Sequence, residues 1–276
     1  MIFNKTLKQT VDDYGLMAKK ALGQNFLLDQ NVTDKIIRLS LEKQGLQNFN
    51  RFDVLEIGPG PGGLTRAVLS AFPKSLTVIE MDERCIEIMQ ELKVQTNVVF
   101  NIVNADALKF DFSDFQLKNL QIVSNLPYNI SVPLLTNWLK NIEGIKAMTL
   151  MFQKEVADRI CADIKTKEYG RISVLAQLIC RVQRLWTLNP EYFIPAPKVQ
   201  SSVLLFQPLK KRPSEEILEK VEKLTMAAFS QRRKMIRQSL KSVQNLEKIC
   251  SDIGVALTAR AEEITPQQYL AMAQNL

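Results

Sequence analysis

The sequence predicts an α/β fold, with a mostly parallel sheet followed by a small all-helical domain. Two observations support the sheet. Apolar runs typical of buried strands alternate with helical patterns up to residue 206, and a glycine-rich turn at residues 58–63 follows one of these runs. A third observation supports the helical domain, because strand signals are absent beyond Pro213.

The first strand that matters for function spans residues 52–57 and ends in the loop Gly58-Pro59-Gly60-Pro61-Gly62-Gly63. Glycines permit a tight turn and a close approach of backbone to ligand before a helix begins near Leu64. Because this loop satisfies G-x-G-x-x-G, a dinucleotide-binding dehydrogenase is one interpretation. Pro59 and Pro61 remove two backbone donors that a pyrophosphate needs, which favours a nucleoside ligand without one.

The next predicted strand, residues 75–79, carries Glu80 at its carboxyl end. This is roughly the separation from the glycine loop at which an acidic residue reaches a ribose diol, so Glu80 is predicted to hold a sugar. Met81 offers a soft apolar contact for a purine. The alternative is that Glu80 only stabilises the start of a helix near Asp82, where negative charge is favourable.

A third predicted strand, residues 98–103, ends at the segment Asn104-Ala105-Asp106-Ala107-Leu108. Because this strand ends at the same edge of the sheet, Asp106 is expected beside the other polar groups. Its carboxylate can accept a hydrogen bond from an adenine amino group. Ala107 is included among the predicted ligand contacts.

A fourth predicted strand, residues 120–124, leads into the turn Asn125-Leu126-Pro127-Tyr128-Asn129-Ile130-Ser131. The Asn125 amide oxygen and the carbonyl after Leu126 or Pro127 can accept both N–H bonds of a planar amine such as adenine N6, while Tyr128 stacks on its ring. The alternative is a Pro-Tyr turn that merely ends a strand. Polar groups at four successive strand ends favour a ligand crevice, because open α/β sheets bind ligands there.

Two more strands are predicted at residues 147–152 and 201–206. The second follows a loop that contains Pro195 and Pro197, and this loop can carry Phe193 over the pocket. The alternative is a proline-rich connector with a buried phenylalanine.

The predicted domain boundary lies between Pro208 and Pro213. It divides the chain into an α/β domain, residues 1–208 with an N-terminal extension at 1–21, and a small helical domain, residues 209–276. Ser214 before two glutamates is typical of a helix start, and Thr265-Pro266-Gln267-Gln268 has a capping-box pattern with Pro at the first helical position.

Within this second domain, Arg233, Arg237 and Lys241 recur at helical i, i+4 spacing, with Arg232 and Lys234 flanking them. A basic helix face of this kind can track RNA phosphates, which supply affinity but little sequence information. The alternative is an ordinary solvated helix face.

Composition limits the chemistry that the chain can perform. Its 276 residues include no histidine, which excludes a His general base, a Ser-His or Cys-His nucleophile pair and a His-ligated metal. The four cysteines are widely spaced, so reduced, mostly buried thiols are expected, without a metal site. A net charge of +7 favours a polyanionic partner. No apolar run of about 18 residues is present, so a cytoplasmic location without a membrane partner is expected.

Several segments resemble the ribosomal RNA adenine N6,N6-dimethyltransferase family, which belongs to the class I S-adenosylmethionine-dependent methyltransferases. They occur in family order from about Lys19 to the C-terminus: Leu22-Gly23-Gln24-Asn25-Phe26-Leu27, Glu56-Ile57-Gly58-Pro59-Gly60, Asn125-Leu126-Pro127-Tyr128-Asn129-Ile130-Ser131, Gln153-Lys154-Glu155-Val156, Tyr169-Gly170-Arg171-Ile172-Ser173, Phe193-Ile194-Pro195-Ala196-Pro197-Lys198-Val199 and Gln231-Arg232-Arg233-Lys234. The last segment and the Gly-Pro-Gly loop are similar to the branch that modifies small-subunit RNA, rather than the antibiotic-resistance branch that acts on the large subunit.

The resemblance implies that residues 1–208 form a Rossmann-like catalytic domain with a mostly parallel seven-stranded sheet, which binds S-adenosylmethionine as cofactor, and that residues 209–276 form an RNA-binding domain. It also implies a role in ribosome biogenesis, and a monomer is expected. The implied substrate is a hairpin loop with two adjacent adenosines near the 3′ end of small-subunit ribosomal RNA, naked or in an assembling particle. The family's catalytic positions fall on Asn125, Leu126, Pro127, Tyr128 and Phe193. With the contacts argued above, the predicted cofactor site is Asn25, Leu27, Gly58, Gly60, Glu80, Met81, Asp106, Ala107 and Asn125.

Amine methylation agrees with the absence of histidine, because the protein must mainly align donor and acceptor and stabilise charge developing on nitrogen. Two other interpretations stay open. A DNA or protein methyltransferase can use the same turn, although those usually have a second proline where Leu126 stands. A noncatalytic RNA-binding or transcription factor can descend from such enzymes, but the presence of Glu80, Asp106 and Asn125 argues against lost cofactor binding.

Overall fold

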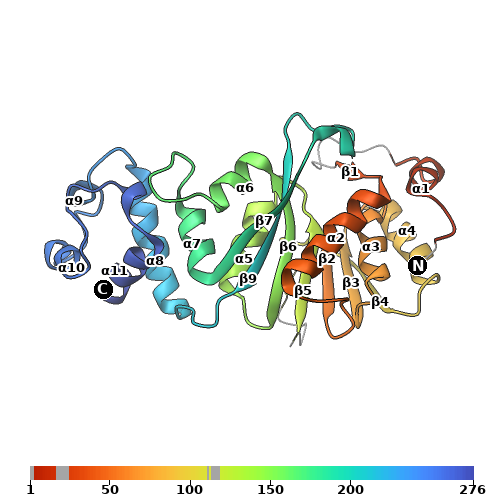
Figure 1. Cartoon of the computed structure of the whole chain (residues 1–276), viewed down its shortest axis with the longest axis horizontal. Coiled ribbons are helices and arrows are strands. Elements are labelled where there is room, and N and C mark those ends of the chain that lie inside the picture. Colours follow the sequence, from red (N-terminus) through yellow and green to blue (C-terminus); the bar gives the residue numbers. More distant parts are fainter. Residues whose placement is uncertain (1–2, 17–24, 111, 113–118) are drawn as a thin grey trace. The chain divides into compact units, whose positions relative to one another are not determined.

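The computed structural model describes residues 3–16, 25–110, 112 and 119–276 (Figure 1). The predicted N-terminal extension and the Gly-Gln-Asn-Phe-Leu segment therefore lie partly outside the described residues. Contacts divide the chain into two units. Unit 1 comprises Met1–Leu135, Ile142–Lys154 and Arg184–Phe206, and unit 2 comprises Thr136–Asn141, Glu155–Gln183 and Gln207–Leu276.

The sheet has seven strands in the order β4 (Val99–Asn104), β3 (Ser75–Glu80), β2 (Asp53–Ile57), β5 (Leu120–Asn125), β6 (Ile145–Gln153), β9 (Ser201–Pro208) and β7 (Cys180–Leu188). Neighbours from β4 to β6 are parallel, whereas β9 runs antiparallel to β6. The predicted α/β class and mostly parallel seven-stranded sheet are confirmed. The strand at β7 was not among those predicted from the residues.

Helices of unit 1 share one core with the sheet. They are α1 (Leu7–Asp13), α2 (Gln30–Gln44), α3 (Gly63–Ser70) and α4 (Glu83–Lys93), and α5 (Ser131–Lys140) begins in this unit. Fully buried apolar side chains such as Val68, Leu69 and Val78 belong to this core. A second, two-stranded sheet pairs β1 (Phe26–Leu27) with β8 (Phe193–Ile194), which follows the short helix η3 (Pro190–Tyr192).

Unit 2 contains α6 (Lys154–Ile160) apart from its first residue, together with α7 (Arg171–Ile179), α8 (Glu215–Ser230), α9 (Ile236–Ser239), α10 (Leu246–Asp252), η4 (Ala261–Glu263) and α11 (Pro266–Gln274). Both predicted helix starts are confirmed: the Ser214 side chain caps α8, and Thr265 forms a capping box with Gln268 before α11, with Pro266 in the first turn. Residues 155–183 belong to this unit by contacts, so the units do not follow the single break expected at 208. Separate functions for 1–208 and 209–276 remain predictions.

The continuous basic helix predicted from the spacing of Arg233, Arg237 and Lys241 is wrong. Helix α8 ends at Ser230, α9 spans only Ile236–Ser239, and Met235 between them is extended, with φ −63° and ψ 148°. Met235 forms an antiparallel bridge with Arg260. Arg233 therefore lies in a turn, Arg237 in α9 and Lys241 after it, so the three do not share one continuous helix face.

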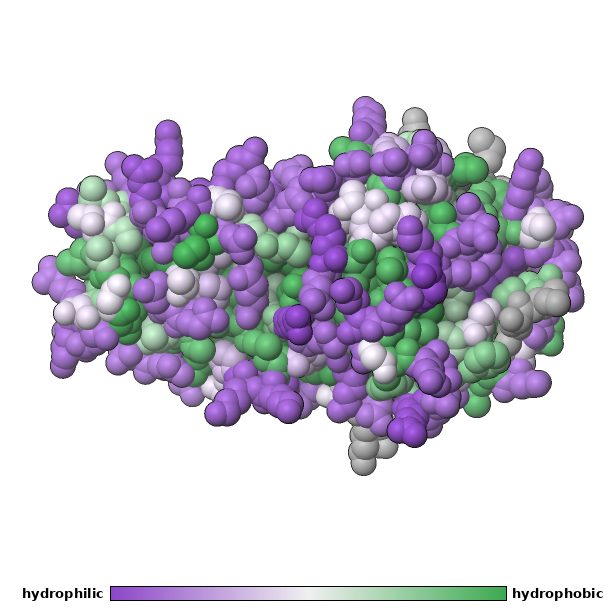
Figure 2. Space-filling model, viewed as in Figure 1, coloured by the Kyte–Doolittle hydropathy of each residue, from purple (hydrophilic) through white to green (hydrophobic). Residues whose placement is uncertain are grey.

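Hydrophilic side chains cover most of the face shown in Figure 2. Within the described residues, none of the helices combines the length and the apolar character needed to cross a bilayer. None of the four cysteines, all of which are described, forms a disulfide, and Cys85, Cys180 and Cys250 are buried.

Candidate functional site

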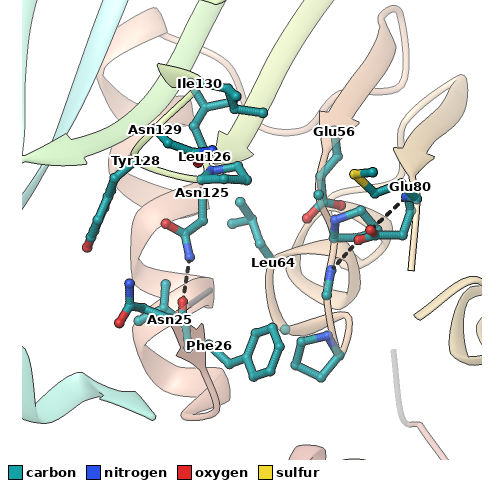
Figure 3. Close-up of a pocket in the computed structure, with 18 of the residues that line it drawn as sticks. Asn25, Phe26, Glu56, Leu64, Glu80, Asn125, Leu126, Tyr128, Asn129 and Ile130 are labelled. Carbon is teal, nitrogen blue, oxygen red and sulfur yellow. Dashed lines mark hydrogen bonds between the residues drawn. The ribbon is translucent and has the colours of Figure 1, made fainter. Parts of the chain in front are cut away.

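A cavity of about 340 Å³ lies at the carboxyl ends of the parallel strands β2, β3 and β5 (Figure 3). It is lined by most of the residues predicted for the cofactor and catalytic sites: Asn25, Leu27, Gly58, Gly60, Glu80, Met81, Asp106, Asn125, Leu126, Pro127 and Tyr128. All of these residues belong to unit 1. The parallel strands thus bring distant sequence segments together at one edge of the sheet, as predicted.

The glycine loop approaches the cavity in a conformation that side chains rarely adopt. Gly60 has φ +55°, and a Cβ atom there would lie 3.0 Å from the Phe26 ring. The Gly58 N–H donates to the Ile79 carbonyl at 2.9 Å, which ties the loop to β3. Glycine at position 60 therefore permits both the turn and the close approach of β1.

Glu80 is held by three backbone donors at the end of β3. Its Oε1 accepts from Met81 N–H at 2.8 Å and its Oε2 from Gly60 N–H at 3.4 Å (Figure 3). Its Oε1 also accepts from Asp82 N–H at 3.0 Å. Burial raises the pKa of this carboxyl, although these backbone bonds oppose the shift. Helix α4 is capped by the Asp82 side chain, which accepts from Arg84 N–H. Glu80 accepts the N–H of this capping residue, so the structure agrees with both predicted roles of Glu80, at the ligand and at the helix start.

Glu56 is a second buried acid at the cavity, and no role was predicted for it from the sequence. Its side chain is 1% exposed, and its Oε2 accepts from the Thr65 hydroxyl at 2.7 Å. Burial, opposed by Thr65 and reinforced by the charge of Glu80, raises the pKa of Glu56 to about 8. The signal in the sequence was an acidic residue inside an apolar strand.

Asp106 lines the cavity from the segment after β4, and its Oδ1 accepts from Leu108 N–H at 3.0 Å. The structure places the half-exposed side chain of Leu108 at the cavity instead of Ala107, which is buried and is not among the lining residues. Met81, also largely exposed, lines the cavity as predicted. These two apolar side chains suit the faces of a flat ring.

The Asn125–Tyr128 turn is fixed by hydrogen bonds at both ends. The Ser124 hydroxyl donates to the Ile57 carbonyl at 2.7 Å, which joins the end of β5 to the end of β2. Asn125 Nδ2 donates to the Asn25 carbonyl at 3.2 Å (Figure 3). Burial raises the pKa of Tyr128, whose hydroxyl lies 2.7 Å from Ser201 Oγ.

Phe193 does not reach the cavity. Its side chain is 2% exposed and belongs to the hydrophobic core, and it pairs with Leu27 in the two-stranded sheet. The structure thus agrees with a proline-rich connector that buries its phenylalanine, and it does not bring Phe193 over the pocket. A contact between Phe193 and the target base has no support in this arrangement.

The five predicted RNA-binding residues lie in unit 2, and one of them, Arg232, differs from the others because its guanidinium forms hydrogen bonds within the protein. Arg232 Nε donates to Glu262 Oε2 at 2.5 Å, and its Nη2 donates to the Thr166 carbonyl at 2.8 Å. Arg232 therefore joins segments within unit 2. Arg233, Lys234, Arg237 and Lys241 are exposed.

Sheet order, glycine loop and cavity together define a class I methyltransferase. The chain belongs to the ribosomal RNA adenine dimethylase family, whose model matches residues 15–276, and is thus an RNA methyltransferase. It is 40% identical to the ribosomal RNA small subunit methyltransferase A of Rhodospirillum rubrum, over 97% of this chain and 91% of that protein. It is 42% identical to the Wolbachia protein of the same name, over 95% of this chain and 94% of that protein. Among solved structures, a dimethyladenosine transferase from Plasmodium falciparum has a TM-score of 0.72 and 25% identity, covering 88% of this chain and 94% of that one.

Proposed function

We propose that this chain transfers methyl groups from S-adenosylmethionine to N6 of two adjacent adenosines in a hairpin loop near the 3′ end of small-subunit ribosomal RNA. The observation that carries the proposal is one cavity that combines a glycine loop, buried acids and the Asn125–Tyr128 turn. The small subunit is supported by the names of the relatives from Rhodospirillum rubrum and Wolbachia.

The residues at the cavity fit a positively charged nucleoside cofactor. Glu56, Glu80 and Asp106 line it, whereas its described lining includes neither lysine nor arginine. S-adenosylmethionine carries a sulfonium and an ammonium group, which the carboxylates of Glu80 and Asp106 attract. Glu56, whose pKa is raised to about 8, keeps its proton at neutral pH and adds no charge. NAD carries an anionic pyrophosphate, and Pro59 and Pro61 lack the N–H groups that would bind it.

Two acceptors are available for the adenine amino group. Because Asn125 Nδ2 donates to the Asn25 carbonyl, its Oδ1 faces away from that carbonyl and can accept one N–H bond. The Pro127 carbonyl already accepts the Ile130 N–H at 3.1 Å within the turn. The Leu126 carbonyl is therefore the better second acceptor, which narrows the choice that the sequence left open.

These acceptors favour methylation because the N–H bonds become more polar as nitrogen donates its lone pair. When bound, S-adenosylmethionine supplies an activated methyl group and a neutral leaving group. Asn125 and Leu126 hold the amino group and stabilise its developing charge, and Tyr128 stacks on the adenine that has left the RNA stack. The proton is lost to solvent, so histidine is not needed.

The test is transfer of labelled methyl groups to small-subunit RNA and to small-subunit particles that lack the modification, with mass analysis of the nucleosides. Dimethyladenosine is expected, and Asn125→Ala should lose about 10²- to 10³-fold in rate, the scale for deleting one polar contact to developing charge. Asn101→Ala, which removes an exposed amide on β4, is the matched control. Absence of N6-methylated adenine on both substrates, or full activity of Asn125→Ala, would contradict the proposal.

A further inference from the structure

Tyr128 is held at its far end by a residue 73 positions away in the chain. Its hydroxyl lies 2.7 Å from the Ser201 hydroxyl, close enough for a hydrogen bond in which either oxygen can donate. Ser201 is fully buried, and Tyr128 is partly buried with its side chain at the cavity. The bond therefore connects the catalytic turn to the first residue of β9.

Ser201 belongs to the hydrogen-bonded sheet of unit 1. It is in register with Gln153 at the end of β6, and the adjacent Gln200 carbonyl accepts the Lys154 N–H at 2.8 Å. The backbone end of Tyr128 is also fixed, because its carbonyl accepts the Ser131 hydroxyl at 3.0 Å. Both ends of the aromatic side chain are thus restrained, one by the turn and the other by the sheet.

This restraint matters because a stacking platform works only in the correct plane. In the view of Figure 3, Asn125 appears between Tyr128 and Glu80, and all three residues line the cavity in which Asn125 would hold N6. A displacement of about 1 Å in a positioning group can reduce a rate by roughly 10²-fold. Side chains at a reactive site are held in the productive geometry by hydrogen bonds from supporting residues.

We propose that Ser201 is a positioning residue for methyl transfer, which fixes the plane of Tyr128 through the hydrogen bond between their hydroxyl groups. This rests on the proposed function, in which Tyr128 stacks on the target adenine. Ser201 acts through Tyr128 and contacts neither substrate nor cofactor.

The next residue supplies a matched control. Ser202 is equally buried, and its hydroxyl also lies near a single side-chain hydroxyl, that of Thr187 on β7, at 3.0 Å. Neighbouring strand positions face opposite sides of a sheet, and neither Ser202 nor Thr187 is among the residues that line the cavity. Ser202→Ala therefore removes a comparable buried hydrogen bond without affecting Tyr128.

The experiment compares Ser201→Ala, Ser202→Ala, Tyr128→Phe and the double variant Ser201→Ala/Tyr128→Phe. We expect Ser201→Ala and Tyr128→Phe each to lower kcat by roughly 10- to 100-fold, with unchanged binding of S-adenosylmethionine. The double variant should be no slower than the slower single variant, because both remove the same bond. Ser202→Ala should keep the kcat of the parent chain and should lose about as much thermal stability as Ser201→Ala. Equal kcat losses in Ser201→Ala and Ser202→Ala, or additive losses in the double variant, would overturn the proposal.

A readout without substrate separates this proposal from the proposed function. Aromatic NMR order parameters of the Tyr128 ring should fall in Ser201→Ala and stay unchanged in Ser202→Ala. A rigid ring in Ser201→Ala would refute the positioning role even if methyl transfer were found. Loss of ring order in a chain that methylates no adenine would instead refute the proposed function alone.

Discussion

Replacing Glu56 by glutamine should make the protein more stable above neutral pH. The Glu56 carboxyl is 1% exposed, and its pKa is raised from 4.5 to about 8, first of all by burial. In the folded state it keeps its proton over a range in which the unfolded chain loses it. The contribution of the protonated Glu56 carboxyl to the free energy of unfolding is therefore fully present below about pH 4.5, and it is lost as pH rises through about 8.

The size of the effect follows from the shift. One pKa unit corresponds to about 1.4 kcal/mol, so a shift from 4.5 to about 8 gives a total on the order of 5 kcal/mol. Glutamine has nearly the same shape and can still accept the Thr65 hydroxyl, but it does not ionise. The free energy of unfolding of Glu56→Gln relative to the parent chain should thus rise steadily between pH 5 and 8.

Urea denaturation of both proteins at a series of pH values measures this difference. The buried neighbour Glu80 also has a raised pKa, but it is present in both chains, so most of its contribution cancels. Glu87→Gln, on the exposed side of α4, controls for the loss of one negative charge. A difference between Glu56→Gln and the parent that does not change with pH would refute the reasoning.

Elements marked by local signals were predictable from the sequence. The glycine loop, the acid at the end of β3 and the helix caps at Ser214 and Thr265 each depend on a few adjacent residues. The parallel strands then place the loop, Glu80 and the Asn125–Tyr128 turn together without further information, because their carboxyl ends share one edge.

Strand β7 was missed because nothing marks its beginning. Helix α7 ends at Ile179, and the next residue, Cys180, already has the extended angles φ −130° and ψ 150°. Neither glycine nor proline separates the helix from the strand, so the apolar run across the junction resembles one continuous element.

The prediction of a basic helix and the prediction of Phe193 over the pocket were wrong because of contacts between segments distant in the sequence. The i, i+4 spacing after Arg233 is compatible with a helix, but pairing of Met235 with Arg260 interrupts it. Phe193 pairs with Leu27 in strands of only two residues, which leave too little periodicity to detect. Glu56 was overlooked because its neighbours made the segment look like an ordinary buried strand.

Four further predictions test the cofactor site and the basic residues. Calorimetric titration should show tighter binding of S-adenosylmethionine than of NAD; the reverse order would exclude the proposed cofactor. Gly60→Ala should lose cofactor affinity, because φ +55° strains an alanine and its Cβ would press on a neighbouring ring; unchanged affinity in the same titration would contradict this. Arg233→Ala and Arg237→Ala should weaken RNA binding and reduce the slope of log affinity against log salt by about one unit per lost phosphate contact. Arg232→Ala should instead lower the thermal stability, since this guanidinium donates to Glu262 and to a backbone carbonyl. An unchanged salt slope in the Arg233 and Arg237 variants would make these exposed cations ordinary solvated charges and would require RNA binding by another surface.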